Sequence, residues 1–200
     1  MNRAAIAIMA TSFLFLGART AMAQPNTARI VGFGHSGTGC PAGTVDASIS
    51  EDAQRIFVGF DQYVAESKLS GLDRKNCQLR VTMQFDPAWS FSIASVDYRG
   101  FAGLPAGTRG ENVSTYFFAG ERPMGDARAK TSLVGPFFEN YARRDNVGLM
   151  VFSPCGPAEH DLVINNEVRV MGRDAIMTVD SITGQLEVVY NLLWKKCPRP

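Results

Sequence analysis

Two histidines are the side chains of this sequence best suited to acid–base chemistry near neutral pH. His35 precedes Ser36, and His160 lies between Glu159 and Asp161. Either imidazole could serve as the base of a secreted hydrolase, or could bind a metal ion. The carboxylates show no spacing that marks an acid–base pair, and an exposed loop histidine is the simpler interpretation of both. We therefore predict no metal site and no catalytic residue, with His35 and His160 as the candidates for the alternative.

A glycine pattern near the start of the chain matches the turn that binds dinucleotides. Gly32, Gly34 and Gly37 form G-x-G-x-x-G after an apolar run. A dinucleotide site needs a helix directly after the third glycine, because the pyrophosphate binds at the helix N-terminus. Here Gly37 is followed by TGCP, which cannot begin such a helix. The pattern predicts a structural loop, and we expect no cofactor.

Two polar clusters are the densest groups of charge in the chain. One runs DRKN before Cys77, and the other runs DYRG in the middle of the sequence. An arginine beside a carboxylate most often forms a fork of hydrogen bonds that pins a loop. The alternative is a polar binding cluster, whose candidate residues are Asp73, Arg74, Asp97, Tyr98 and Arg99.

The four cysteines indicate a covalent framework. Cys40, Cys77, Cys155 and Cys197 form no C-x-x-C pair and are widely spaced, which disfavours a metal site. An even number of cysteines in an exported chain predicts two disulfides. Three pairings exist, and the spacing alone does not choose among them. We prefer Cys40–Cys77 with Cys155–Cys197.

Export itself is predicted by the N-terminus. A short basic start, an apolar stretch and Ala21-Met22-Ala23 are typical of a secretory signal peptide over residues 1–23, cleaved before Gln24. The remaining residues, 24–200, have a length that suits one domain. No later stretch is long and apolar enough to span a membrane, so we expect no transmembrane segment.

The charge of the mature chain is close to zero. The whole chain has 20 Lys and Arg residues and 19 Asp and Glu residues, and the signal peptide removes Arg3 and Arg19, which leaves a net charge near −1. Such a balance provides no long-range attraction to nucleic acid or to an anionic membrane. We therefore expect no nucleic-acid partner.

The elements that must position these residues show a period of two. Apolar and polar residues alternate in four segments, which is typical of strands with one buried face: Ile56–Phe60, Cys77–Phe85, Leu162–Met171 and Leu186–Trp194. Gly- and Pro-rich turns separate the segments, and no window sustains a helical stripe. The sequence predicts an all-β fold, an antiparallel β-sandwich of the jelly-roll or immunoglobulin-like type, in a single domain with two disulfides.

Two segments depart from the simple alternation. The phase slips between Phe91 and Tyr98, and a β-bulge near Ala94-Ser95 would explain the slip. The segment Asn146–Phe152 is almost continuously apolar and is interpreted as a central strand of the sandwich.

Asn112 begins an N-x-S sequence, which matters for glycosylation only in a eukaryotic source.

Several strings together resemble a known family. They are GTGCPAGTV at Gly37–Val45, FDQY at Phe60–Tyr63, RKNCQL at Arg74–Leu79, DYRGFAGL at Asp97–Leu104, YFFAG at Tyr116–Gly120, GPF at Gly135–Phe137, SPCG at Ser153–Gly156 and WKKC at Trp194–Cys197. In this order and spacing, the chain resembles the secreted domain of unknown function 4360 (DUF4360) family, found in fungi and bacteria, over about residues 32–197. The resemblance implies an exported, cysteine-bridged, β-rich single domain with a small residue where His35 stands. It implies no activity.

These observations favour a secreted, disulfide-stabilised β-sandwich that acts as a binding or envelope-associated module rather than as an enzyme. A glycan or an envelope component is the class of partner we expect. The alternative is a secreted hydrolase that uses His35 or His160 as its base. A histidine close to a serine or carboxylate in a concave pocket would favour the enzyme. An exposed aromatic patch at Trp89 or Tyr141 would favour the binding module.

Overall fold

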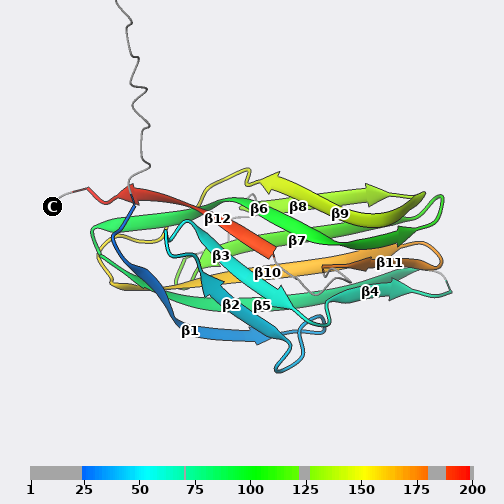
Figure 1. Cartoon of the computed structure of the whole chain (residues 1–200), viewed down its shortest axis with the longest axis horizontal. Helices are drawn as coiled ribbons and strands as arrows, with labels where there is room; N and C mark the ends of the chain where they lie inside the picture. Colours follow the sequence, from blue (N-terminus) through cyan, green and yellow to red (C-terminus); the bar gives the residue numbers. More distant parts are fainter. Residues whose placement is uncertain (1–23, 70, 122–126, 180–187, 199–200) are drawn as a thin grey trace, which may run out of the picture.

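The strands of the chain form two antiparallel sheets that pack face to face (Figure 1). The computed structural model describes residues 24–69, 71–121, 127–179 and 188–198. The first sheet has five strands in the order β1-β5-β10-β7-β8, which are Ala28–Ser36, Leu72–Phe85, Glu159–Met171, Arg109–Phe118 and Arg128–Val134. No helix occurs among the described residues, and hence none that is long and apolar enough to cross a membrane.

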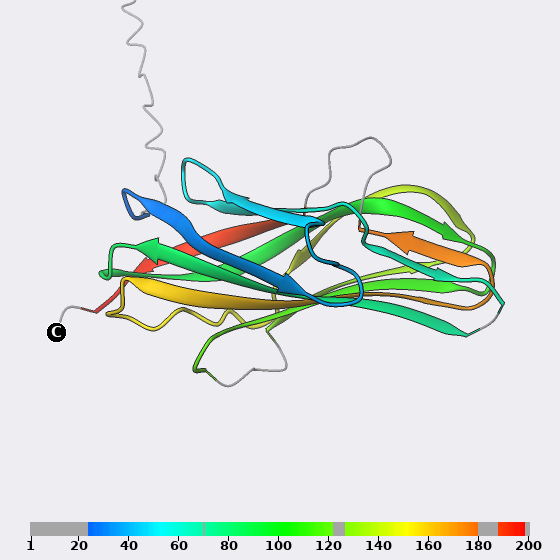
Figure 2. The same cartoon turned by 90° about the horizontal axis from the view of Figure 1, so that it is seen from below.

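The second sheet has seven strands in the order β2-β3-β12-β6-β11-β4, with β9 on the other edge of β6. These strands are Val45–Ile49 (β2), Arg55–Phe60 (β3), Val64–Ser67 (β4), Trp89–Leu104 (β6), Phe137–Asn146 (β9), Ala175–Thr178 (β11) and Val188–Lys196 (β12). The two sheets run along the long axis of the molecule, as Figure 2 shows from the side. The predicted antiparallel sandwich is therefore confirmed.

The alternation of residue types explains which face of each strand is buried. In β5, Cys77, Leu79, Val81, Met83 and Phe85 are buried, while the intervening polar residues point to the outside. Aromatic rings then join the two sheets. The ring of Phe91 on β6 meets Phe85 and Phe118 of the first sheet edge-on, at centroid distances of 5.4 and 5.1 Å. The inward residues of the strands thus form one core, and polar side chains are left on both outer faces.

The phase slip in β6 is a β-bulge, as predicted. Asn191 on β12 pairs with Ser95, but the next residue, Leu192, pairs with Ile93. Ala94 is therefore the additional residue on β6, and its carbonyl oxygen accepts a hydrogen bond of 3.0 Å from the Val147 amide. The bulge lets residues on both sides of the slip keep their apolar side chains in the core.

The prediction of a central strand at Asn146–Phe152 is wrong. Strand β9 ends at Asn146, and the following residues cross from the second sheet towards β10 without joining a ladder. Leu149 and Met150 are 41% and 44% exposed. The apolar run misleads because it has no alternation, and an apolar composition alone does not distinguish a buried strand from a connection along the surface.

Strand β12 begins at Val188, and residues 186–187 of its predicted range lie outside the described residues.

Both preferred disulfides are confirmed. Cys40–Cys77 joins the turn after β1 to β5, and Cys155–Cys197 joins the segment before β10 to the end of β12. The first bond ties the segment after the edge strand β1 to β5 of the same sheet, and the second links the two sheets at one end of the molecule. With sequence separations of 37 and 42, each contributes about 4 kcal/mol if loop entropy alone is counted.

Candidate functional site

The glycine pattern at the N-terminus is structural. Gly32 and Gly34 lie within β1 and pair with β5, and no helix follows Gly37. Gly37 has a φ of 143°, and a Cβ atom there would lie 2.2 Å from the carbonyl oxygen of Asn76. Gly39 packs against the ring of Tyr63, 2.1 Å from where its Cβ would be. The glycines let the chain pass close to β5 and bring Cys40 to Cys77.

The two histidines have no catalytic partners in the described part of the chain. His35 is half-buried on β1, and its Nδ1 donates to the carbonyl oxygen of Cys40 at 3.2 Å. His160 is 6% exposed, stacks on Phe85 at a centroid distance of 4.9 Å and donates from Nε2 to the Pro157 carbonyl at 3.0 Å. Burial lowers the pKa of His160. Neither imidazole bonds to a serine hydroxyl or to a carboxylate among these residues, so the geometry does not support a base at either position.

The two aromatic residues whose exposure would have favoured a binding module are both buried. Trp89 and Tyr141 lie in the core, and the Tyr141 hydroxyl donates to the carbonyl oxygen of Thr178 at 2.6 Å. These two rings therefore offer no surface on which a ligand could stack.

The five residues of the predicted polar cluster lie in two different sheets. Asp73 and Arg74 are on β5, whereas Asp97, Tyr98 and Arg99 are on β6. Asp73 accepts a hydrogen bond of 2.8 Å from the Glu66 amide and so holds β4, and Tyr98 is completely buried. Arg74 and the pair Asp97 and Arg99 instead point outwards on opposite faces of the sandwich, each into a different pocket.

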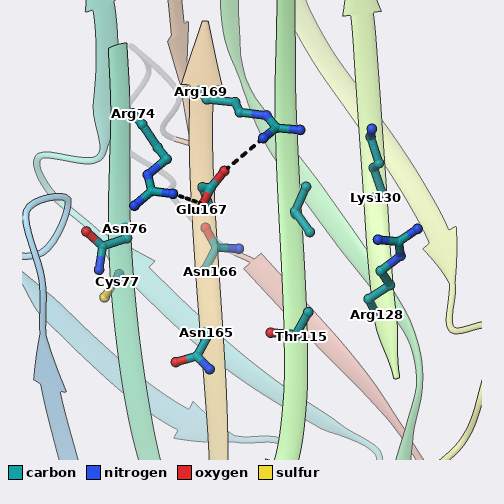
Figure 3. Close-up of a pocket in the computed structure, with 11 residues that line it drawn as sticks. Arg74, Asn76, Cys77, Thr115, Arg128, Lys130, Asn165, Asn166, Glu167 and Arg169 are labelled. Carbon is teal, nitrogen blue, oxygen red and sulfur yellow. Dashed lines mark ion pairs between the residues drawn. The ribbon is translucent and has the colours of Figure 1, made fainter. Parts of the chain in front are cut away.

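The pocket at Arg74 is the candidate site (Figure 3). It is a cavity of about 400 Å³ on the outer face of the first sheet, across β5, β10, β7 and β8. The polar side chains that line it come from all four strands: Arg74, Asn76, Thr115, Arg128, Lys130, Asn165, Glu167 and Arg169. Four of these side chains are cationic, and one, Glu167, is a carboxylate.

Strand register explains why these side chains meet. Arg74 on β5 lies opposite Arg169 on β10, and Glu167 lies opposite Val113, which in turn lies opposite Lys130 on β8. Asn165, Thr115 and Arg128 form the next row. Residues in register share one face of a sheet, because side chains alternate along each strand.

Two carboxylates hold the cations in place. The Glu111 side chain is only 3% exposed, and it receives Lys130 Nζ at 2.9 Å and Arg169 Nε at 2.8 Å. Glu167 lies between two guanidinium groups, 3.4 Å from Arg74 Nη1 and 3.4 Å from Arg169 Nη1 (Figure 3). Glu167 thereby offsets the repulsion expected between two arginines on neighbouring strands.

The electrostatics of Glu111 reflect these contacts. Burial of its carboxyl would raise its pKa, but the hydrogen bonds from Lys130 and Arg169 outweigh burial, and the pKa is lowered. The Glu111 carboxylate is therefore ionised and paired at neutral pH. Arg128 forms no ion pair with any described residue, so the pocket retains excess positive charge.

Sequence reasoning identified only Arg74 among the residues of this site. The polar lining residues that it did not name as candidates are Asn76, Thr115, Arg128, Lys130, Asn165, Glu167 and Arg169. A weak signal exists, because Arg128 and Lys130, like Glu167 and Arg169, stand two positions apart and so share a face of their strand. Only the order and register of the strands bring these pairs to Arg74.

Comparisons with known proteins agree with the expected family. The family described as "Domain of unknown function (DUF4360)" matches residues 26–197. A relative from Arthroderma benhamiae, described as an uncharacterized secreted protein, is 36% identical over 183 residues, which cover 87% of this chain and 74% of that protein. The relative and the two disulfides fit an extracellular protein.

Similarity to solved structures is much weaker. TmCBM61 in complex with beta-1,4-galactotriose has a TM-score of 0.30 and 10% identity, over 84% of this chain and 90% of that chain. Tailspike protein 4 of bacteriophage CBA120 has a TM-score of 0.30 and 14% identity, over 82% of this chain and 19% of that chain. Scores this low carry no argument about a ligand.

Proposed function

The chain belongs to the DUF4360 family, and on that premise we propose that it is an exported module that binds a glycan bearing carboxylate or sulfate groups. The observation that carries this proposal is the pocket on the first sheet, in which four cationic side chains and one carboxylate surround a cavity of about 400 Å³. In this proposal residues 1–23 direct export and are removed after Ala23, and residues 24–200 act as one binding domain.

The cations suit an anionic group because the protein already holds them in place. Glu111 pairs with Lys130 and Arg169, and Glu167 pairs with Arg74 and Arg169. A ligand then meets donors whose conformational entropy is already reduced. Guanidinium groups present paired N–H donors that match the oxygens of a carboxylate or a sulfate.

The neutral side chains of the pocket suit a sugar backbone. Asn76, Asn165 and Thr115 lie beside the cations and offer both donors and acceptors for hydroxyl groups. Among the described residues, no aromatic side chain lines the pocket. Proteins that bind single-stranded nucleic acid usually stack bases on aromatic rings, so an acidic glycan fits this pocket better than a nucleic acid. An acidic polysaccharide of an envelope or extracellular matrix is the kind of partner that an exported protein would meet.

Titration calorimetry with an oligogalacturonate, a sulfated dextran oligomer and a neutral dextran oligomer tests this proposal. The purified chain without residues 1–23 should bind one of the acidic oligomers, and neutral dextran should not bind. Arg128→Gln and Arg74→Gln should each weaken binding about 10- to 100-fold, since a hydrogen bond to a charged group contributes about 1.5–3 kcal/mol. Binding should also weaken as salt is raised.

Arg173→Gln is the matched control. Arg173 is exposed in the turn between β10 and β11, outside the pocket, and the substitution removes the same charge. If Arg173→Gln weakened binding as much as Arg128→Gln, the attraction would depend on net charge and the pocket would not be the site. Equal binding of neutral and acidic oligomers would overturn the anionic class. Tighter binding of single-stranded DNA through the same residues would reassign the ligand to nucleic acid.

A further inference from the structure

The outer face of the second sheet carries another basic pocket. It is a cavity of about 590 Å³, and its charged lining consists of Arg55, Asp97, Arg99, Arg143 and Arg144. These side chains come from β3, β6 and β9. As in the first pocket, four cations face one carboxylate.

The one carboxylate of this pocket is already fully engaged. Asp97 lies opposite Arg144 in the ladder between β6 and β9, and the two side chains form a fork, with Nε to Oδ1 at 2.5 Å and Nη2 to Oδ2 at 2.7 Å. Asn191 Nδ2 donates to Oδ2 at 2.9 Å. The hydrogen bonds from Arg144 lower the pKa of Asp97. Asp97 therefore neutralises Arg144 and leaves the other three arginines uncompensated.

Those three arginines have no ion pair among the described residues. Arg55 lies over the ring of Phe57, with its guanidinium carbon 5.5 Å from the centroid. Arg143 donates to the carbonyl oxygen of Ala142 at 3.0 Å, and Arg99 is exposed. Guanidinium groups without an ion-pair partner present paired N–H donors that match the oxygens of a carboxylate or a sulfate.

The two pockets point in opposite directions. Arg74, Glu167 and Lys130 occupy outward positions of the first sheet, and Arg55, Asp97 and Arg99 occupy outward positions of the second. The buried core lies between them, because the two sheets pack through their inner faces. A glycan segment that fills one pocket cannot reach the other without passing around the molecule.

We infer that the protein is bivalent and cross-links two anionic glycan chains, one on each outer face of the sandwich. The ligand class of the second pocket rests on the function proposed above, but the existence of a second site does not. Linking two chains through two moderate sites would retain the protein in a polymer network far longer than either site alone.

The experiment measures stoichiometry and cross-linking separately. A short oligogalacturonate, titrated by calorimetry, should occupy two sites per chain. A long polygalacturonate should form light-scattering complexes at intermediate protein ratios, and these should dissolve when either the protein or the polymer is in large excess. Because the stoichiometry is counted per chain, self-association of the protein cannot imitate the second site.

Matched double variants assign the two sites. Arg55→Gln with Arg99→Gln removes two of the three unpaired arginines of the second pocket and keeps the fork of Arg144 and Asp97. Arg74→Gln with Arg128→Gln removes two of the four cations of the first pocket. Each pair should leave one site per chain and abolish light scattering, while far-UV circular dichroism confirms the fold. Arg173→Gln should retain two sites.

The outcomes separate this inference from the proposed function. One site per wild-type chain, lost only in the variant of the first pocket, would overturn bivalence and leave the proposed function standing. If the wild-type chain has one site and only the variant of the second pocket loses it, both the bivalence and the proposed function are overturned. Two binding sites per chain without cross-linking of the polymer would also contradict the inference. Both faces of the protein would then bind the same glycan chain.

Discussion

The hydroxyl group of Tyr63 donates a hydrogen bond of 2.7 Å to the backbone carbonyl of Asn166, at the centre of the sandwich. Tyr63 precedes β4 of the second sheet, and Asn166 lies on β10 of the first. This bond therefore ties the two sheets together below the candidate site. Three other buried tyrosines differ from it, because the hydroxyl groups of Tyr98, Tyr116 and Tyr190 have no hydrogen-bond partner among the described residues.

This contrast predicts opposite effects of the same substitution. Tyr63→Phe should lower the free energy of unfolding by about 1 kcal/mol, since it removes a buried hydrogen bond. Tyr190→Phe should be neutral or stabilising, because a buried hydroxyl without a partner is unfavourable. Chemical denaturation of the two variants and the wild type measures both values. The prediction would be contradicted if Tyr190→Phe lowered the free energy of unfolding more than Tyr63→Phe does.

Asn112 should carry no glycan in the folded protein. Its side chain is fully buried, and its Oδ1 accepts a hydrogen bond of 3.1 Å from Asn166 Nδ2. A glycan attached at this position would force the two sheets apart. Mass spectrometry of the protein secreted from a eukaryotic host should find an unmodified peptide, and a glycosylated Asn112 in folded material would contradict the position of β7.

His160 should reduce the stability of the protein at mildly acidic pH. Burial lowers its pKa in the folded state below the unfolded value of about 6.5. Between these two pKa values the unfolded chain binds more protons, so the free energy of unfolding falls as the pH drops below about 6.5 and levels off below the folded pKa. Comparison with His160→Phe by denaturation between pH 7.5 and 5 isolates this effect. The wild type should lose more stability than the variant over that range, and parallel curves would rule the effect out.

Glu111 should also make the protein less stable as the pH falls, but in a lower pH range than His160. Its folded pKa is lowered, so its contribution is present above the unfolded pKa of about 4.3 and is lost as the pH falls through the folded value. Glu111→Gln should cost about 2 kcal/mol at pH 7, because Lys130 and Arg169 each lose a hydrogen bond to a charged group. The cost should shrink towards pH 3. A cost that did not change with pH would mean that the carboxylate charge is not what holds the two cations.

Local patterns predicted most of the fold because they depend on the chain alone. The alternation in Cys77–Phe85, the phase slip at Ala94 and the choice of cysteine pairs were all confirmed. Asn146–Phe152 failed because its pattern was apolar without a period, and only the path of the chain between the sheets leaves Leu149 and Met150 exposed.

The candidate site is of a different kind, since its residues are far apart in the sequence. Arg74 and Asp97 stand in polar clusters that the sequence singles out, but the side chains next to them in the chain point to the other face of their strands. Their partners are Glu167 and Arg144, which strand register places opposite or diagonal to them.

By itself, then, the sequence predicted four alternating strands, the bulge and two disulfides, and it contains nearly equal numbers of basic and acidic residues. The tertiary structure alone decided where the charges lie. It brought four cations and one carboxylate together in the lining of each pocket, although the charges of the chain nearly balance. The physical reason is that alternation fixes which side chains of a strand share a face, whereas the order and register of distant strands fix which charges become neighbours.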